Sequence, residues 1–538
     1  MLNKKEMLAI VLLFLLAFFL FTWNIGSTPI LDGDTAFSAT IAKNILISNN
    51  WITLKFIDPN EIICKPPLFY WMMAAGGKLF GINEFGMSIL HSLIGALTVL
   101  LTYFIARALF NQKVAFWSAL VLLSSAQFFY QGRSPLQDIP LTFFIAAALY
   151  CFILFEKRKN YLFYYLIPVF AALATLTKGP VGLVLVGLVL MLYVIYNKKL
   201  LKYLNLHLLG ALMIFLLVAA PWFIAGYQIQ GPAFARIFLT SNVGRFFMPI
   251  DQTGTNLSAP IHPQYDFYTL PLMLLIVFVP WSGFLYPAIF AKLKEEKFLI
   301  SWIVGVVVFF SLSLNYKIGR YILPAYPALA ILIAKFLCDA ADQAEKLPEK
   351  LKWPLLISKW LTIGLILPLL ILTAIYFALI FPAEQSAYQP IVLPTLSTLI
   401  AGMLLMSIFL LKNQIGRAMA AAAAFAILAY LILIPSLNHY FPEANPAKQL
   451  CLKVNQMAHP TDEIVLYNSP AAIPFAAYYL DRSFTTQNNP TALRQKLAGK
   501  HKVIVLYLDA RGQAAINSAH LKYNLVSNQN GFMLFSNQ

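Results

Sequence analysis

Two aspartates separated by one glycine, Asp32 and Asp34, follow directly after the first long apolar run of the 538-residue chain. Gly33 lets the backbone turn tightly between them, and a helix-like segment follows. One carboxylate could cap that helix by accepting its free N–H groups. A second carboxylate at the same place is suited to remove a proton from a hydroxyl group as a general base, or to hold a divalent metal ion.

A lysine and an aromatic block occur further along the chain, in the sequence CKPPLFYW. Lys65 precedes two prolines and is therefore expected to lie on an extended segment. A lysine beside aromatic residues is common where a helix enters a membrane interface. The alternative interpretation is a fixed cation for a phosphate group.

Four further polar clusters stand at the ends of other apolar runs, where ionisable residues are costly and usually functional. They contain Arg133 and Asp138 in QGRSPLQDIPL, Lys178 in LTKGPVGL, Arg245 in SNVGRFFMP with His262 after it, and Lys317, Arg320 and Tyr321 in NYKIGRYILPAYPAL. A single charged residue in a loop is usually only hydrated. The repetition of such clusters indicates a shared site.

Membrane helices must position these residues, because the chain is 60% hydrophobic and only 11% charged, with a mean hydropathy of +0.72. Soluble domains carry about 25% charged residues. This composition excludes an ordinary cytosolic enzyme, a disordered protein and a nucleic-acid-binding protein. The net charge of +17 is therefore assigned to loops beside the membrane. Four scattered cysteines without a CxxC pair exclude a disulfide framework.

About thirteen apolar runs are long enough, or nearly so, to cross a membrane as helices, which takes about 20 residues each. They lie near residues 7–23, 86–106, 114–130, 138–155, 161–177, 180–196, 205–227, 267–290, 298–314, 321–338, 357–381, 390–411 and 418–437. Lys and Arg concentrate in alternate loops, so the positive-inside rule predicts a cytoplasmic N-terminus. An odd number of spans places the C-terminal tail on the outer side.

Two long loops and the tail lie on the outer side in this topology. The loops cover residues 24–85 and 228–266, and loops of such length are commonly functional. The tail alternates apolar runs, EIVLY at 463–467 and KVIVLYL at 502–508, with helix-like segments, and an Asn-Gly pair near its end predicts a hairpin. We expect a mainly α, polytopic transmembrane helix bundle over residues 1–437 and a small soluble α/β domain over residues 438–538.

The polar clusters all fall on the outer side, where they would form one cavity at the lipid–water boundary. Its acids are Asp32, Asp34 and Asp138, and its cations are Lys65, Arg133, Lys178, Arg245, Lys317 and Arg320. Such cations suit a phosphate head group whose lipid tail stays in the bilayer. A lipid-phosphate leaving group together with an activated hydroxyl describes glycosyl transfer from a polyprenyl-phosphate sugar. No GxxxxGK[ST] or GxGxxG nucleotide motif is evident.

Four segments in this order resemble the GT-C type membrane glycosyltransferases: the aspartate-rich first loop, KPPLFYW at 65–71, LTKGPVGL at 176–183 and YILPAYPALAIL at 321–332. The likeness covers nearly the whole chain. It points to the bacterial branch that includes lipid A aminoarabinose transferases and protein O-mannosyltransferase-like enzymes. It implies a GT-C fold and an inverting transfer from a polyprenyl-phosphate sugar.

The resemblance also implies roles for individual residues. Asp34 matches the catalytic base, and Asp138 matches an acidic residue at the start of the fourth span. Lys65, Arg320 and Tyr321 match positions close to the donor phosphate. We therefore expect Asp34 and Asp138 to be catalytic. We expect substrate to be bound by Asp32, Lys65, Arg133, Lys178, Arg245, Lys317, Arg320 and Tyr321.

The sequence departs from the family pattern at two positions. Cys64 stands where the family has a glutamate before the lysine, and His262 matches a loop histidine that binds metal with that glutamate. Because cysteine is a good zinc ligand, Cys64 and His262 could hold a divalent metal, Zn or Mg. Phe37 replaces an arginine that often follows the first-loop aspartate, which leaves the identity of the sugar open.

Two acceptors remain open at this stage, lipid A and a protein hydroxyl, because both use the same donor chemistry. A lipid flippase or transporter is a more distant alternative, since no inverted repeat of the kind found in transporters is evident. The expected partners are the polyprenyl-phosphate sugar, the acceptor and membrane lipids, and no nucleic acid. The expected location is the bacterial inner membrane, with the C-terminal domain in the periplasm.

Overall fold

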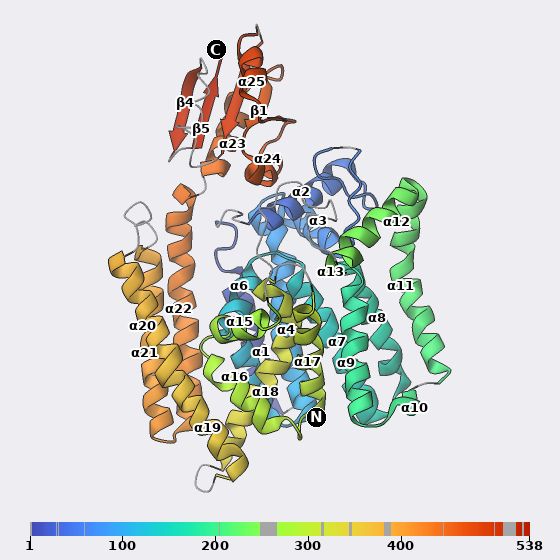
Figure 1. Cartoon of the computed structure of the whole chain (residues 1–538), viewed down its shortest axis with the longest axis vertical. Coiled ribbons are helices and arrows are strands. Elements are labelled where there is room, and N and C mark those ends of the chain that lie inside the picture. Colours follow the sequence, from blue (N-terminus) through green and yellow to red (C-terminus); the bar gives the residue numbers. More distant parts are fainter. Residues whose placement is uncertain are drawn as a thin grey trace.

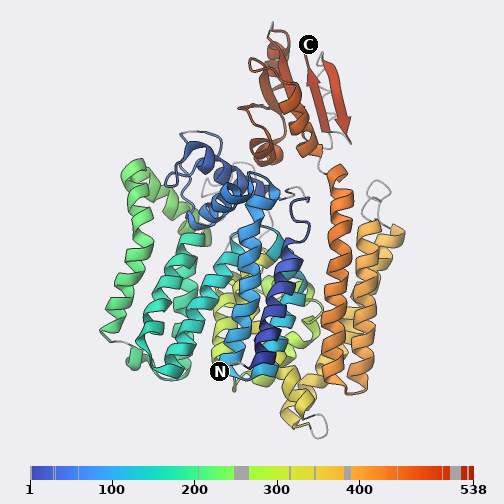
Figure 2. The same cartoon turned by 180° about the vertical axis from the view of Figure 1, so that it is seen from behind.

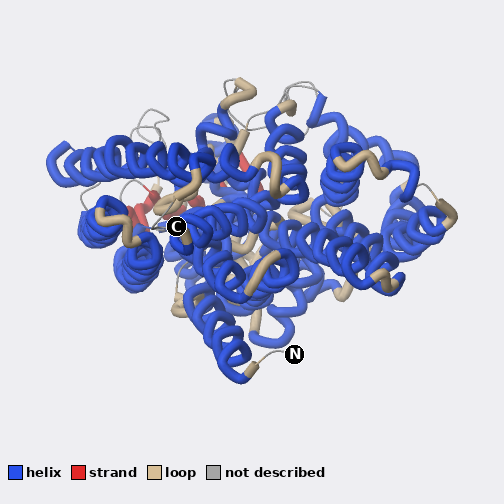
Figure 3. The backbone as a smooth tube through the Cα atoms, turned by 90° about the horizontal axis from the view of Figure 1, so that it is seen from below, coloured by secondary structure: helices blue, strands red, loops and turns tan. Residues whose placement is uncertain are grey.

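Long apolar helices lie side by side and form the body of the molecule, and the C-terminal region lies beyond one end of them (Figure 1). This computed structural model describes every residue except 1–2, 28–29, 31, 59, 204, 248–265, 314–316, 344–346, 381–388, 445, 500, 509–522, 530–531 and 538. Strands occur only in the C-terminal region of the described chain, so the bundle seen end-on consists of helices and loops (Figure 3).

Within the described residues, nine helices are long and apolar enough to cross a membrane. They are α1 (Lys4–Thr22), α4 (Glu84–Leu109), α7 (Asp138–Arg158), α8 (Tyr161–Lys178), α11 (His207–Gln230), η2 with α18 (Gly319–Ala325, Tyr326–Asp342), α19 to η4 (Glu349–Leu379), α21 (Gln389–Leu411) and α22 (Ile415–Ala444). A tenth is the pair α5 (Gln112–Ser124) and α6 (Ala126–Arg133), which bends by 67°.

The remaining predicted apolar runs also contain helices, but shorter or broken ones: α9 (Val181–Tyr196), α15 (Thr269–Val277), α16 (Ser282–Lys292) and α17 (Lys297–Ser311). The mainly helical, membrane-spanning architecture is confirmed. The number of thirteen spans stays a prediction. The segment between α17 and η2 and the predicted outer loop at 228–266 are only partly described.

Shorter helices and the parts of the span over residues 349–380 complete the bundle. They are α2 (Gly33–Ser48), α3 (Leu68–Phe80), α10 (Leu200–Tyr203), α12 (Pro232–Leu239), η1 (Thr240–Gly244), α13 (Arg245–Phe247), α19 (Glu349–Leu361), η3 (Thr362–Ile366), α20 (Leu367–Ile375) and η4 (Tyr376–Ile380). The helices α2 and α3 are the helical parts of the first long loop at 24–85. They lie across the end of the bundle that faces the C-terminal region (Figure 2).

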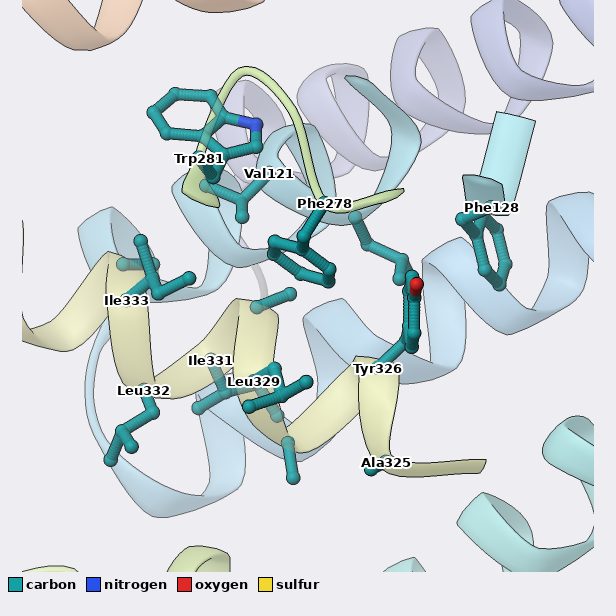
Figure 4. Close-up of a cluster of buried hydrophobic side chains, with 14 of the residues drawn as sticks. Val121, Phe128, Phe278, Trp281, Ala325, Tyr326, Leu329, Ile331, Leu332 and Ile333 are labelled. Carbon is teal, nitrogen blue, oxygen red and sulfur yellow. The ribbon is translucent and has the colours of Figure 1, made fainter. Parts of the chain in front are cut away.

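The first half of helix α18, Tyr326–Ala334, is apolar and buried on all sides, which is typical of the centre of a bundle. Its first residue, Tyr326, packs against Phe278 with ring centroids 4.8 Å apart (Figure 4). The indole of Trp302 donates a hydrogen bond to the Pro324 carbonyl at 2.7 Å. These contacts hold the turn η2, and with it Arg320, in one position relative to the bundle.

The C-terminal region is a small α/β unit with a five-stranded sheet. The strand order is β2-β1-β3-β5-β4, with β1, β2 and β3 parallel and β5 antiparallel to β3 and β4. The strands are β1 (Glu463–Tyr467), β2 (Thr485–Gln487), β3 (Val503–Tyr507), β4 (Asn524–Gln529) and β5 (Phe532–Ser536). The helical elements are α23 (Pro446–Met457), η6 (Pro470–Ala472), α24 (Ile473–Tyr479) and α25 (Pro490–Leu497).

The sequence prediction for this region is confirmed at β1, at β3 and at the hairpin of β4 and β5. It missed β2, a strand of three residues whose side chains are mostly exposed. So short a run carries too little alternation of apolar and polar residues to be recognised. The α/β unit is joined to the membrane part by a shared apolar core that includes Ile41 and Ile45 of α2 and Leu450 of α23.

The helices α8 and α9 pack closely where the chain turns after Lys178. Replacing Gly182 with alanine is expected to lower stability, because a Cβ there would lie 2.3 Å from the carbonyl carbon of Ala174. Overpacking of this kind costs about 1–3 kcal/mol. Thermal unfolding of the detergent-solubilised protein measures the loss.

The matched control is Gly187→Ala in the same helix, where no atom lies within 4 Å of the new Cβ. Removal of a glycine from a helix interior stabilises by roughly 0.5–1 kcal/mol, so the control should unfold at or above the wild-type temperature. Equal unfolding temperatures for Gly182→Ala and the wild type would contradict the close packing of α8 and α9.

Candidate functional site

Four charged side chains from four separate segments form a connected network at the end of the bundle that faces the C-terminal region. The Arg320 guanidinium lies 2.5 Å from Asp34, measured from Nη2 to Oδ2, and 3.7 Å from Asp138, measured from Nε to Oδ2. The Lys178 ammonium lies 2.5 Å from the other carboxylate oxygen of Asp138. Arg320 therefore connects two acids that are far apart in the sequence.

The two acids of this network differ sharply in exposure. The Asp34 side chain is 62% exposed, whereas the Asp138 side chain is 4% exposed. A buried charge is tolerated only with close partners, so Asp138 is suited to hold the two cations. Asp34 is open to solvent and is suited to meet a substrate.

The helix α2 begins at this site because Asp32 caps it. Its carboxylate oxygen accepts hydrogen bonds from the backbone N–H and the hydroxyl of Thr35, both at 3.2 Å. Asp32 thus satisfies one of the free N–H groups of the first turn, and Asp34 contacts Arg320. Substrate binding by Asp32 stays a prediction.

An aromatic ring supports the cation that pairs with Asp138. Lys178 is the last residue of α8, and its ammonium lies 4.8 Å from the centre of the Tyr321 ring. The Tyr321 ring packs against the Phe310 ring, with the two ring centroids 5.6 Å apart.

Gly179 comes directly after Lys178 and has a φ of +82°. A Cβ on it would lie 2.9 Å from the Asn242 side-chain oxygen. The tight turn between α8 and α9 therefore requires glycine at this position.

A second aromatic ring lies beside the lysine of the CKPP segment. The Lys65 ammonium is 4.7 Å from the centre of the Phe37 ring, which packs against Phe56 with centroids 4.7 Å apart. Phe37 lies one turn after Asp34 on α2, so both residues project from the same side of that helix. Phe37, one of the two residues that depart from the family pattern, therefore attracts the Lys65 ammonium with its ring face.

Three other predicted site residues lie outside this network or outside the described side chains. Arg133 donates hydrogen bonds to the carbonyls of Leu20 and Trp23, at 2.7 Å and 3.0 Å, and so ties the end of α1 to α6. The side chain of Arg245 and the whole of His262 lie outside the described part of the chain. Their roles in substrate or metal binding, like that of Arg133, stay predictions.

Lys317 lies just before η2 and is buried. Its ammonium donates a hydrogen bond to the Ser313 carbonyl at 3.1 Å. Burial lowers the pKa of Lys317, and the nearby charge of Asp266 opposes that shift. The Lys317 side chain therefore lies inside the protein, on the segment just before Arg320. Its contact with substrate stays a prediction.

Cys64, a candidate metal ligand, lies in surroundings that favour a protonated thiol. Its thiol donates to the Phe234 carbonyl at 3.3 Å, and burial raises the pKa of the thiol to about 11. Metals bind the thiolate, which this environment disfavours. No three metal-ligating residues lie together among the described residues. The metal site also includes His262, which lies outside the described residues, so it stays a prediction.

The sequence interpretation missed Tyr70 and Gln137 as supports of the site. The Gln137 amide donates to the Tyr70 hydroxyl at 3.2 Å, which connects α3 with the residue before Asp138. Tyr70 is fully buried, and burial raises its pKa, so it stays protonated. The aromatic block FYW is the available signal, but the sequence leaves its segment open between a membrane interface and a phosphate site.

Several known sequences are similar to this chain. The family model described as dolichyl-phosphate-mannose-protein mannosyltransferase matches residues 64–224. A protein of uncharacterised function from Aquifex aeolicus (strain VF5) is 31% identical over 457 residues, covering 83% of this chain and 82% of that protein. The undecaprenyl phosphate-alpha-4-amino-4-deoxy-L-arabinose arabinosyl transferase 1 of Proteus mirabilis (strain HI4320) is 30% identical over 317 residues, covering 57% of this chain and 55% of that protein.

A solved structure shares the fold along the entire chain. The crystal structure of ArnT from Cupriavidus metallidurans bound to undecaprenyl phosphate matches with a TM-score of 0.78 at 18% identity, and it covers 100% of this chain and 99% of that chain. The expected GT-C fold, a helical membrane bundle followed by a small C-terminal α/β unit, is thereby confirmed.

The buried pair of Asp138 and Lys178 gives a prediction for stability. Lys178→Met is expected to destabilise the protein by about 3–5 kcal/mol, the cost of removing one partner of a buried pair, because the buried Asp138 then keeps only its longer contact with Arg320. The double variant Asp138→Asn/Lys178→Met removes both charges and should recover part of this loss. Equilibrium unfolding of the purified protein in detergent measures the free energies for a double-mutant cycle.

The control is Lys352→Met, which removes a lysine that pairs with Glu349 on the exposed surface. An exposed pair of this kind is worth about 0–1 kcal/mol, so that variant should unfold almost as the wild type does. Additive losses in the Asp138/Lys178 cycle would show that the two side chains do not stabilise each other.

Proposed function

The chain belongs to the GT-C type membrane glycosyltransferases, and we propose that it transfers a sugar from a polyprenyl-phosphate donor to a hydroxyl or phosphate acceptor such as lipid A. One observation carries the proposal. The Arg320 guanidinium contacts an exposed carboxylate and a buried carboxylate at the same time. It can therefore bind an anionic leaving group beside a base that solvent can reach.

In the proposed reaction, Asp34 accepts the proton of the acceptor hydroxyl. The acceptor oxygen forms a bond with the anomeric carbon while the bond from that carbon to the phosphate oxygen breaks. The bonding electrons leave with the polyprenyl phosphate, which Arg320, Lys178 and Lys65 stabilise. A single displacement of this kind inverts the anomeric carbon. Asp138 keeps the cations in place, so their contribution is positional and electrostatic.

The contact between Arg320 and Asp34 implies an exchange of partners. The Arg320 guanidinium forms an ion pair with Asp34, the proposed base, at 2.5 Å. An arriving phosphate competes for the same guanidinium, because Arg binds phosphate and carboxylate with the same paired N–H groups. Donor binding would thus free Asp34 to accept a proton.

The relatives support the identity of the donor. The Proteus mirabilis relative is described as acting with an undecaprenyl phosphate-linked aminoarabinose, and the ArnT crystal structure contains undecaprenyl phosphate. We propose the same donor class for this chain, with lipid A as acceptor.

A protein acceptor is the second candidate. It is supported by the family model that matches residues 64–224, which is described as a protein mannosyltransferase. Mass spectrometry of lipid A and of envelope glycoproteins, from cells with and without the gene, distinguishes them.

We also propose an inner-membrane location with the N-terminus in the cytoplasm and the C-terminal unit in the periplasm. The helix α1 begins at the end of the bundle opposite the C-terminal unit (Figure 1). Lys and Arg concentrate in the loops at the end where α1 begins, which supports this orientation under the positive-inside rule. The charged network then faces the periplasm.

Asp34→Asn is expected to reduce transfer to background while the protein still folds and binds undecaprenyl phosphate. The substitution removes the proton acceptor and preserves the shape of the side chain. Release of undecaprenyl phosphate from undecaprenyl phosphate-4-amino-4-deoxy-L-arabinose by the purified protein measures the activity. The control is Asp58→Asn, an exposed carboxylate in the same loop that should have little effect. Wild-type activity in Asp34→Asn would rule out the proposed base.

Phe37→Leu is expected to raise the donor KM by about 2- to 30-fold, which corresponds to a cation–π contribution of about 0.5–2 kcal/mol. The reason is that Lys65 loses the ring that helps to hold its ammonium. The same assay with varied donor concentration measures KM. Phe80→Leu, an exposed aromatic of the neighbouring helix α3, is the control. An unchanged KM in Phe37→Leu would show that the Phe37 ring does not contribute to donor binding.

A further inference from the structure

A tyrosine of the C-terminal unit reaches the segment that leads to the proposed base. The Tyr479 hydroxyl, at the end of α24, accepts a hydrogen bond from the Ile30 backbone N–H at 3.0 Å. It donates to a carboxylate oxygen of Glu84 at 3.1 Å. Both the tyrosine and the glutamate are buried. One hydroxyl therefore joins three segments that are distant in the sequence.

The glutamate in this contact is anchored independently. Glu84 is the first residue of α4, a membrane-spanning helix. Its carboxylate also forms an ion pair with Lys448 of α23, whose ammonium lies 5.5 Å from the centre of the Tyr479 ring. The tyrosine hydroxyl is thus held against the bundle and has little freedom to move.

The segment that donates this hydrogen bond leads directly to the proposed base. Ile30 lies two residues before Asp32, the cap of α2, and four residues before Asp34. Further along α2, the Lys43 ammonium donates to the carbonyls of residues 478 and 480, at 2.9 Å and 3.1 Å. Both the approach to α2 and its later turns are therefore bound to the chain around α24.

We propose that Tyr479 is a positioning residue for Asp34, so that the C-terminal unit is part of the catalytic centre. This inference rests on the proposed function. The Tyr479 hydroxyl sets where α2 begins and, through α2, where the Asp34 carboxylate stands relative to Arg320. Misplacement of a reacting group by about 1 Å can cost roughly 100-fold in rate, so a remote hydrogen bond can control catalysis.

The chain supplies a matched pair of variants. Tyr478 is the neighbouring residue and is buried to a similar extent, but within the described residues its hydroxyl has no hydrogen-bond partner. Tyr479→Phe and Tyr478→Phe each remove one buried oxygen and leave both rings in place. Only Tyr479→Phe breaks the connection to Ile30 and Glu84.

In the undecaprenyl phosphate-4-amino-4-deoxy-L-arabinose assay, Tyr479→Phe is expected to lower kcat by about 10- to 100-fold. The donor KM and the affinity for undecaprenyl phosphate should stay within about twofold of the wild type, since the cations of the site are untouched. Tyr478→Phe should retain the wild-type kcat. Lys43→Met, which loosens α2 from the same unit, should show the same selective loss of kcat.

A double variant separates positioning from general damage to the fold. In a Lys43→Met background, Tyr479→Phe should lower kcat by less than it does in the wild type, because both substitutions act through the position of α2. Equal kcat values for the two tyrosine variants would overturn the inference, as would fully additive losses of Lys43→Met and Tyr479→Phe in the double variant. If the wild type releases no undecaprenyl phosphate, the proposed function fails instead. If Asp34→Asn keeps full activity, the proposed base fails.

Discussion

A carboxylate buried at the end of an apolar bundle is the constraint on which the site depends. Asp138 has almost no exposed surface, and an ionised carboxylate in such surroundings is stable only beside cations. Lys178 and Arg320 therefore have to remain close to it. Since Arg320 also reaches Asp34, the requirement to neutralise a buried acid determines the geometry around an exposed one.

Aromatic rings contribute to the site in a way that charges could not. Tyr321 and Phe37 lie against the ammonium groups of Lys178 and Lys65. A ring attracts a cation by its quadrupole and adds no negative charge, so it orients the lysine without cancelling its attraction for phosphate. In the proposed reaction this matters because the leaving group gains charge as the glycosidic bond breaks.

The C-terminal unit is structurally continuous with the membrane part. Apolar residues of α2, α3, α23 and the sheet share one core, and the polar contacts of Lys43 and Tyr479 cross the same boundary. A helix as short as α2 is held by tertiary contacts rather than by its own propensity. The position of Asp34 therefore depends on residues more than 400 positions later in the chain.

The sequence by itself determined the membrane class, the helical runs and the hairpin of β4 and β5, because these follow from composition and from patterns of neighbouring residues. It also singled out Asp34, Asp138, Lys178 and Arg320 as chemically unusual. Only the tertiary structure decided which of these meet, because burial and packing between distant segments are not encoded in local spacing. That is why Asp32 caps a helix while Asp34 faces Arg320, why Arg133 binds carbonyls of α1, and why Tyr479 lies at the approach to α2.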